Sequence, residues 1–261
     1  MDLAGSRVVV TGAASGIGRA LLHELEPFAV GGLAVDRDAA GLRAALAELP
    51  GRARWQELVC DVGSDAGVET VLARVAALSG VDVFFANAGF AYYERFGATE
   101  WEHAEAIFRV NVLSPLVTLA RLEARAAGRP FTFVITGSSM GRLGLPGYAL
   151  YSATKAAIDQ FAAALAHEGP RVGRLMVVYP IATRTGFFDT AGATDSIPWP
   201  AQEPEVVARA IIRGVRRDSR RVYPSRLFWA LDTLARPILG LYRRREAQRF
   251  EARERARLAD G

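Results

Sequence analysis

Tyr151 and Lys155 are the two residues whose types and spacing point most directly to chemistry. They stand four positions apart, so on a helix their side chains lie one turn apart on the same face. Lys155 is the only lysine among 32 basic residues, which suggests that this position needs a compact ammonium and not a guanidinium. A free phenol has a pKa of about 10, and a neighbouring ammonium lowers that pKa toward the working range. The pair predicts a general acid/base, although exposed tyrosine–lysine pairs also occur on ordinary helices.

Ser138 and Asn111 are the other candidates for a catalytic role. Ser138 follows an apolar run of strand length and lies 13 residues before Tyr151, so its hydroxyl is suited to hold a substrate oxygen for Tyr151. Ser139 is adjacent and remains the alternative. Asn111 falls inside a helical pattern, where asparagine has poor propensity. It is therefore either a tolerated polar residue or one that serves the site.

A glycine-rich turn, Thr11 to Gly18, joins the first apolar strand to a helix. Gly12 permits a tight turn, Gly16 lets the backbone approach a pyrophosphate, and Gly18 lets helix and strand pack closely. The helix that follows offers unpaired N–H groups and the positive end of its dipole to phosphates. The turn therefore predicts a dinucleotide site.

Asp36 ends the next strand, 18 residues after Gly18. A carboxylate there can accept both hydroxyls of the adenosine ribose and repels a 2′-phosphate, so NAD is the expected cofactor. Arg37 leaves NADP as the alternative, because a guanidinium can pair with that phosphate, whereas Ala14 and Ser15 are not basic. The other interpretation of Asp36 is a helix cap.

The spacing TGxxxGxG, together with Tyr151-Ser-Ala-Thr-Lys155, resembles the classical short-chain dehydrogenases/reductases over roughly Ser6 to Phe188. Cys60-Asp61-Val62 resembles the adenine-contacting segment of that family, and Asn87-Ala88-Gly89 resembles its motif after the fourth strand. Pro180 to Thr185 resembles the segment that contacts the nicotinamide carboxamide, but departs from it at Ile181, where the family usually has glycine. With the glycine-rich turn, the residues expected to hold the cofactor are Gly12, Ser15, Gly16, Ile17, Gly18, Asp36, Arg37, Asp61, Val62, Asn87, Ala88, Gly89, Tyr151, Lys155, Pro180, Thr183 and Thr185.

The resemblance also implies roles for the catalytic candidates. The spacing of 13 residues and Gly141 match the family pattern with Ser138 as the catalytic serine. Asn111 resembles the fourth catalytic position, which holds a water that links Lys155 to solvent. The implied reaction is hydride transfer between nicotinamide C4 and a carbinol or carbonyl carbon, with Tyr151 moving the proton.

Three functions remain open at this point. The leading one is an alcohol dehydrogenase/ketone reductase for an apolar secondary alcohol or ketone. The family also contains dehydratases and epimerases that use bound nicotinamide without net turnover. A non-catalytic dinucleotide sensor is the third, and the complete Asn/Ser/Tyr/Lys set argues against it. The apolar substrate is inferred from the expected pocket wall: Phe90, Tyr92, Tyr93, Met140, Leu145, Tyr148, Phe187, Phe188 and Trp199.

Apolar runs of strand length alternate with helix-period segments along the first 180 residues. Strands that are apolar on both faces and separated by helices predict one Rossmann-type, doubly wound parallel sheet with helices on both faces, plus a helical C-terminal extension. The expected strands are 7–11, 32–36, 54–61, 81–87, 131–136, 174–179 and 221–223. The expected helices run to about 25 and over 39–49, 65–78, 101–127, 148–167 and 205–217.

Residues 1–224 are expected to form the catalytic domain, with a substrate lid at about 183–204, and residues 225–261 the extension. The extension carries an apolar stripe, namely Leu227, Phe228, Leu231, Leu234, Ile238, Leu239 and Tyr242, beside Arg243, Arg244 and Arg245. Its cover is expected to be the parent domain or a second subunit of a homo-oligomer, with an anionic membrane surface as the alternative. We expect the segment from Ser225 to be dispensable for the chemistry.

Composition narrows the class of protein. The chain has 261 residues, 51% of them hydrophobic, enough for a large core. It shows neither a signal peptide nor an apolar run long enough to span a membrane, and Cys60 is its single cysteine, so a cytoplasmic or membrane-peripheral location is expected. No metal-ligand spacing and no nucleic-acid recognition motif accompany the basic C-terminal part.

Overall fold

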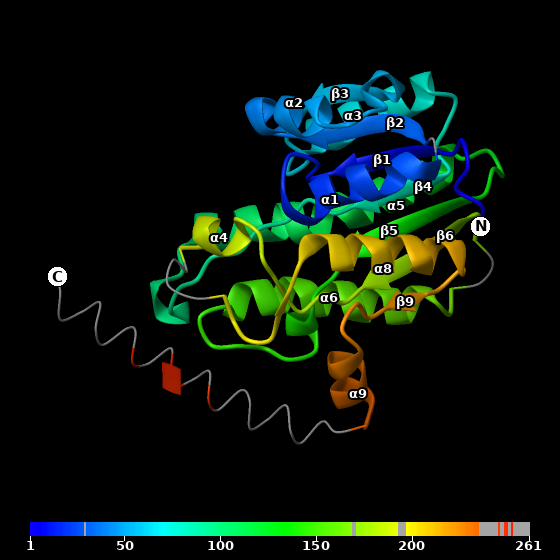
Figure 1. Cartoon of the computed structure of the whole chain (residues 1–261). Helices are drawn as coiled ribbons and strands as arrows, with labels where there is room; N and C mark the ends of the chain where they lie inside the picture. Colours follow the sequence, from blue (N-terminus) through cyan, green and yellow to red (C-terminus); the bar gives the residue numbers. More distant parts are fainter. Residues whose placement is uncertain are drawn as a thin grey trace.

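Seven parallel strands form the central sheet of the computed structural model, in the order β3-β2-β1-β4-β5-β6-β9 (Figure 1). The structure describes residues 1–28, 30–168, 171–192 and 197–234, and the single residues 245, 248, 249 and 252. The strands are β1 (Arg7–Thr11), β2 (Gly31–Asp36), β3 (Trp55–Val59), β4 (Val83–Ala86), β5 (Phe131–Thr136), β6 (Gly173–Val178) and β9 (Arg221–Val222). A separate parallel pair joins β7 (Ala182–Thr183) to β8 (Ala201–Gln202).

Helices cover both faces of this sheet, because alternate side chains of each strand point to opposite faces. The helices are α1 (Gly16–Leu25), α2 (Ala39–Ala47), α3 (Asp65–Ala77), α4 (Trp101–Phe108), α5 (Ser114–Arg125), α6 (Ala149–Leu165), α7 (Phe187–Thr190), α8 (Pro204–Arg216) and α9 (Arg226–Leu234). On β1, Val8 and Val10 belong to the core beneath α1, α2 and α8, whereas Val9 belongs to the core beneath α3, α5 and α6. The predicted doubly wound fold is confirmed.

The order of the strands in the sheet indicates where a ligand can bind. β1 pairs with β2 on one side and with β4 on the other, so the strand order reverses between β1 and β4. In open α/β sheets the crevice at such a reversal, outside the carboxyl ends of the strands, is where ligands bind. The loops after β1, β2, β4, β5 and β6 meet there.

The helix expected over 101–127 is interrupted by a π-helical turn at Arg109–Leu113. Pro115 has no N–H to donate to the carbonyl of Asn111, so the regular ladder cannot continue through this turn. The N–H of Ser114 instead reaches five residues back to the carbonyl of Arg109. The wide turn carries Asn111 into the protein interior, where it is 1% exposed.

The segment expected to form a lid contains short regular elements. β7 and β8 pair near its two ends, and α7 lies between them. The domain boundary at 224 and the motion of a lid stay predictions. Phe187 and Phe188 of α7 pack against Tyr151 and Tyr148, so this segment lies over the start of α6.

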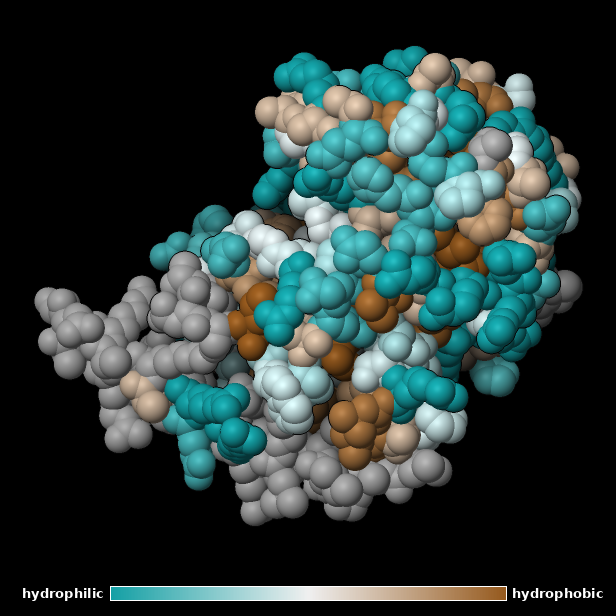
Figure 2. Space-filling view, viewed as in Figure 1, coloured by the Kyte–Doolittle hydropathy of each residue, from teal (hydrophilic) through white to brown (hydrophobic). Residues whose placement is uncertain are grey.

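Helix α9 is packed on the sheet domain through one face. Phe228 and Asp232 are buried, whereas Leu227 and Trp229 are exposed. In Figure 2 hydrophobic side chains gather low in the view, over α9, whereas the surface of α1 and α8 is mostly hydrophilic. The other stripe residues, Ile238, Leu239 and Tyr242, and the neighbouring Arg243 and Arg244, lie outside the described residues.

The associations of the protein stay predictions. Trp101 and Leu113, on α4 and the π-helical turn, are exposed apolar side chains of the kind that a second subunit covers. Among the residues that the structure describes, no helix is both long and apolar enough to cross a membrane.

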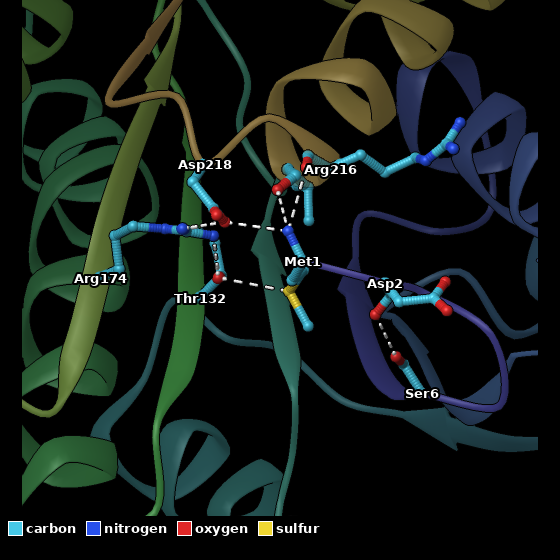
Figure 3. Close-up of polar contacts among 8 residues, drawn as sticks. Met1, Asp2, Ser6, Thr132, Arg174, Arg216 and Asp218 are labelled. Carbon is cyan, nitrogen blue, oxygen red and sulfur yellow. Dashed lines mark hydrogen bonds and ion pairs between the residues drawn. The ribbon is translucent and has the colours of Figure 1, made fainter.

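A polar cluster joins three elements at the amino ends of β5 and β6 (Figure 3). The ammonium of Met1 donates to the carbonyl of Arg216 and to Oδ1 of Asp218, each at 3.0 Å. Arg174 pairs with Asp218 and donates to Oγ1 of Thr132 at 2.7 Å. These contacts hold the N-terminus against the amino ends of the strands, which lie opposite the crevice.

Candidate active site

A cavity of about 500 Å³ lies at the carboxyl ends of the central strands. Every residue that the sequence predicted for cofactor binding or catalysis lines it, except Gly18 and Asn111, which lie directly behind its wall. The cavity also exposes residues that the sequence did not single out, among them Asp38, Val110, Thr136 and Thr190.

The glycine-rich turn is shaped as a phosphate cradle. Gly12 and Gly16 adopt φ values of +68° and +52°, which side-chain-bearing residues rarely tolerate. A Cβ on Gly18 would overlap the carbonyl oxygen of Gly12 and lie 2.7 Å from its carbonyl carbon. The close approach brings the first turn of α1 to the cavity, where the N–H groups of a first helical turn are free to bind an anion. These residues fit the pyrophosphate of a dinucleotide.

Asp36 lines the cavity at the end of β2 and is not the cap of α2. Its Oδ2 accepts the N–H of Ala14 at 3.0 Å, and its Oδ1 accepts the N–H of Asp38 at 3.0 Å. The cap of α2 is Asp38, whose Oδ1 accepts the N–H groups of Ala40 and Gly41. Asp36 therefore fastens the turn while its carboxylate lines the cavity.

Arg37 extends toward the loop after β4. Its Cζ lies 6.0 Å from the ring centroid of Phe90, and both side chains line the cavity. The geometry is that of a weak cation–π contact. The guanidinium thus has an aromatic partner within the protein.

Asn87 ties the ends of three strands together. Its Nδ2 donates to the carbonyl of Thr11 at 3.2 Å, and its Oδ1 accepts from Oγ1 of Thr136 at 3.1 Å. The N–H groups of Asn87 and Ala88 both donate to Oγ1 of Thr11 at 3.1 Å. The amide thereby holds β1, β4 and β5 in register at the cavity.

Tyr151 and Lys155 project from α6 into the cavity beside Ser138, which follows β5. The Nζ of Lys155 donates to the carbonyl of Thr136 at 2.8 Å and lies 5.5 Å from the ring centroid of Tyr151. The Oγ of Ser138 accepts the N–H of Met140 at 3.1 Å. Ser139 does not line the cavity, and its N–H donates to the carbonyl of Pro180. Of the two serines, only Ser138 is placed to meet a substrate.

Burial controls the protonation of this group. It raises the pKa of Tyr151 to about 12, against the effect of a hydrogen bond with Ser138, which lowers it. Burial also lowers the pKa of Lys155 to about 8. The pKa of the phenol is therefore raised and not lowered as the sequence predicted, because the loss of solvation on burial outweighs the hydrogen bond with Ser138. Tyr151 is a neutral phenol at neutral pH.

Asn111 supports the site from behind. Its Oδ1 accepts the N–H of Phe90 at 3.1 Å, and its Nδ2 donates to the carbonyl of Phe90 at 2.9 Å and to Oγ1 of Thr154 at 3.2 Å. A Cβ on Gly89 would lie 3.0 Å from Oδ1 of Asn111 and 3.6 Å from Nζ of Lys155. Asn111 and Lys155 therefore converge on Gly89, and the water-holding role of Asn111 stays a prediction.

The part of the cavity beside Tyr151 is apolar, but fewer residues line it than the sequence predicted. Phe90, Met140, Phe187 and Phe188 line it. The other members of the expected wall do not: Tyr92, Tyr93, Leu145, Tyr148 and Trp199. Tyr148 is buried behind the wall against Tyr93 and Phe188, and Trp199 is 68% exposed. Helical and loop spacing could not distinguish a first layer of aromatic side chains from a second one.

Thr136 is the contributor that sequence reasoning missed. Its carbonyl holds Lys155 and its hydroxyl holds Asn87. The carbonyl contact leaves no side-chain signal, because any residue supplies that atom. The one indication of its role in the sequence was its position at the end of a strand, two residues before Ser138.

Comparisons with known proteins agree with this geometry. A family model described as short chain dehydrogenase matches residues 6–196. L-xylulose reductase of Bos taurus is 32% identical over 190 residues, which cover 71% of this chain and 75% of that protein. A short-chain dehydrogenase structure from Sphingobium yanoikuyae in complex with NADPH has a TM-score of 0.77 and 26% identity, covering 91% and 95% of the two chains.

A structure of a short chain dehydrogenase/reductase from Burkholderia phymatum in complex with NAD has a TM-score of 0.79. It covers 93% of this chain and 97% of that chain at 20% identity, and shows the shared fold. The family model spans most of the chain and includes the glycine-rich turn and the Tyr151–Lys155 pair. The chain therefore belongs to the short-chain dehydrogenase/reductase family of NAD(P)-dependent oxidoreductases.

Proposed function

We propose that this protein is a ketone reductase/alcohol dehydrogenase for apolar secondary alcohols and ketones, with Tyr151 as the general acid/base. The observation that carries the proposal is the placement of Ser138, Tyr151 and Lys155 in one cavity, between a phosphate cradle and an apolar wall. A dehydratase, an epimerase or a dinucleotide sensor would give no net change in absorbance at 340 nm with a ketone, whereas the proposed reductase consumes NADH.

Each catalytic side chain has a role that its surroundings favour. The bound nicotinamide cofactor supplies or accepts the hydride. In reduction, Ser138 holds the carbonyl oxygen and the neutral phenol of Tyr151 donates its proton to that oxygen as negative charge develops. Lys155, with a pKa of about 8, is charged at neutral pH and stabilises the phenolate that remains. The high pKa of Tyr151 keeps the acid form of the phenol available throughout the neutral range.

NAD is the proposed cofactor, because Asp36 places a negative charge where NADP carries its 2′-phosphate. Like charges in contact disfavour binding by several kcal/mol, and about 1.4 kcal/mol is already tenfold. We expect kcat/KM with NADH to exceed that with NADPH, and Asp36→Asn to lower this ratio at least about tenfold. The measurement is kcat/KM for both cofactors with one ketone.

Asp38→Asn is the matched control for this prediction. It removes a charge from the same cavity wall, and asparagine also caps helices, so α2 keeps its N-cap. The ratio should change less in this variant than in Asp36→Asn. A tenfold preference of the wild type for NADPH would contradict the role of Asp36 and assign the discrimination to Arg37.

The substrate prediction rests on the aromatic and aliphatic lining of the cavity. Phe90, Met140 and Phe187 offer apolar contacts, which favour binding of a long-chain or cyclic group on the carbonyl carbon. We expect higher kcat/KM for ketones such as 2-decanone and cyclohexanone than for short polar ketones. The relative named L-xylulose reductase makes sugar ketones the second candidate class. A clear preference for L-xylulose in the same panel would overturn the apolar assignment.

A further inference from the structure

A buried ionic cluster lies outside the cavity, between the site and helix α9. Nη1 of Arg142 lies 2.7 Å from Oδ2 of Asp159, and Nε of Arg142 lies 3.0 Å from Oδ2 of Asp232. The side chains of Asp159 and Asp232 are only 6% and 3% exposed, and that of Arg142 is 19% exposed. None of the three lines the cavity, so they do not meet the substrate or the cofactor.

Two tyrosines complete this cluster. The hydroxyl of Tyr179 donates to Oδ1 of Asp159 at 2.6 Å, and the hydroxyl of Tyr223 donates to Oδ2 of Asp232 at 3.3 Å. The two rings stack with centroids 4.8 Å apart, and Cζ of Arg142 lies 5.9 Å from the ring centroid of Tyr179. One arginine therefore joins α6, α9 and the residues that follow β6 and β9.

The cluster is attached to the segments that carry the proposed catalytic residues. Arg142 ends the short helical turn Ser139–Gly141, which begins directly after Ser138. Asp159 lies on α6, one turn beyond Lys155 and two turns beyond Tyr151. A Cβ on Gly141 would lie 2.7 Å from the carbonyl oxygen of Lys155, so the two segments touch through their backbones.

Helix α9 contributes both charge and packing. Asp232 supplies one of the two carboxylates, and the adjacent Leu231 packs against the apolar cluster that contains Met140, Tyr151 and Phe188. The sequence predicted that the segment from Ser225 is dispensable for the chemistry, and these contacts give a physical reason to test that prediction. α9 is fastened to the back of the catalytic segments and not merely to the surface of the domain.

We propose that Arg142, Asp159 and Asp232 are positioning residues, which lock α9 against the Ser138 segment and α6 so that Ser138 and Tyr151 face one substrate oxygen. The planar guanidinium bridges two carboxylates in fixed directions, which apolar packing alone does not do. Errors of about 1 Å in such positions lower the rate of the chemical step by roughly 10²-fold. The proposal rests on the roles proposed above for Ser138 and Tyr151.

The test uses Asp232→Asn in the full chain, with reduction of 2-decanone by NADH as the assay. The variant keeps the shape of the side chain but leaves Arg142 with one carboxylate partner instead of two. We expect kcat to fall at least tenfold. The Kd for NADH should change less than twofold, because the phosphate cradle lies on β1 and α1, away from the cluster.

A matched control and a second variant separate positioning from stability. Asp218→Asn removes the same charge from an ion pair at the amino ends of the strands, opposite to the cluster, and its kcat should stay at the wild-type value (Figure 3). Arg142→Lys keeps the positive charge but removes the planar guanidinium that bridges the two carboxylates, and it should lower kcat at least fivefold. This variant keeps the proposal testable if Asp232→Asn fails to fold. All variants are assayed well below the thermal midpoint measured for each.

Ser138→Ala, assayed in parallel, distinguishes the two levels of the proposal. If Ser138→Ala keeps the wild-type kcat, or 2-decanone is not reduced at all, the proposed function fails. If Ser138→Ala loses activity while folded Asp232→Asn and Arg142→Lys keep kcat within twofold, only the positioning role is overturned. A lowered thermal midpoint with unchanged kcat would mean that the cluster stabilises the fold and nothing more.

Discussion

Replacing Tyr151 by phenylalanine is expected to lower kcat by roughly 10²–10⁴-fold, the usual cost of losing a proton-transfer group. The phenol is buried at the cavity and hydrogen-bonds with Ser138. Phenylalanine keeps the ring and its edge contact with Phe187, so the shape of the site is retained. The measurement is steady-state kcat with NADH and a ketone that the wild type reduces.

Cofactor binding should survive this change almost intact. The glycine-rich turn proposed to bind the pyrophosphate joins β1 to α1, and Asp36 ends β2. Both lie away from the hydroxyl of Tyr151. Tyr148→Phe is the matched control, because Tyr148 is also buried at the start of α6 but does not line the cavity. A near-wild-type kcat for Tyr151→Phe would exclude Tyr151 as the acid.

Gly18→Ala is expected to damage the cofactor site most among single-methyl changes. The added Cβ would overlap the carbonyl oxygen of Gly12 and lie 2.9 Å from Nδ2 of Asn87. Neither neighbour can withdraw, because Asn87 is held by β1 and β5 and Gly12 forms the turn itself. Overpacking of this kind costs about 1–3 kcal/mol. The helix must tilt or the cradle must open, and we expect the Kd for NADH to rise at least about tenfold.

Fluorescence titration with NADH and thermal unfolding together measure this effect. Gly97→Ala is the control, since a Cβ at Gly97 meets no atom within 4 Å and should change neither quantity. An unchanged Kd for Gly18→Ala would show that the close contact of α1 with the turn does not shape the cofactor site.

The sequence by itself determined the features that depend on local spacing. Tyr151 and Lys155 are four positions apart, which corresponds to about one helical turn, and α6 places both in the cavity. Strands apolar on both faces require helices on both sides, and the two cores on either side of β1 have that form. The glycine-rich turn could be read because positive φ and close approach restrict the residue type at Gly12, Gly16 and Gly18.

Tertiary structure alone decided which of two neighbouring candidates performs a task. The sequence left Asp36 open as a helix cap, and only the hydrogen bonds of the folded chain assign the cap of α2 to Asp38 instead. Trp199 is as aromatic as Phe187, yet it lies outside the cavity. Side-chain type carries no information on which layer a residue occupies, because that depends on how separate elements pack.

The role of α9 shows the same limit over a longer separation. Its helical spacing predicted an apolar stripe, and Phe228 is indeed buried. The contact between Arg142 and Asp232 joins residues 90 positions apart, and the sequence around either residue contains no motif that predicts this contact. Local patterns report preferences along the chain, whereas an ion pair of this kind forms only after the sheet has brought β6, β9 and α6 together. The sequence therefore determined the fold and the proposed chemistry, and the tertiary structure decided which distant side chains hold the two in place.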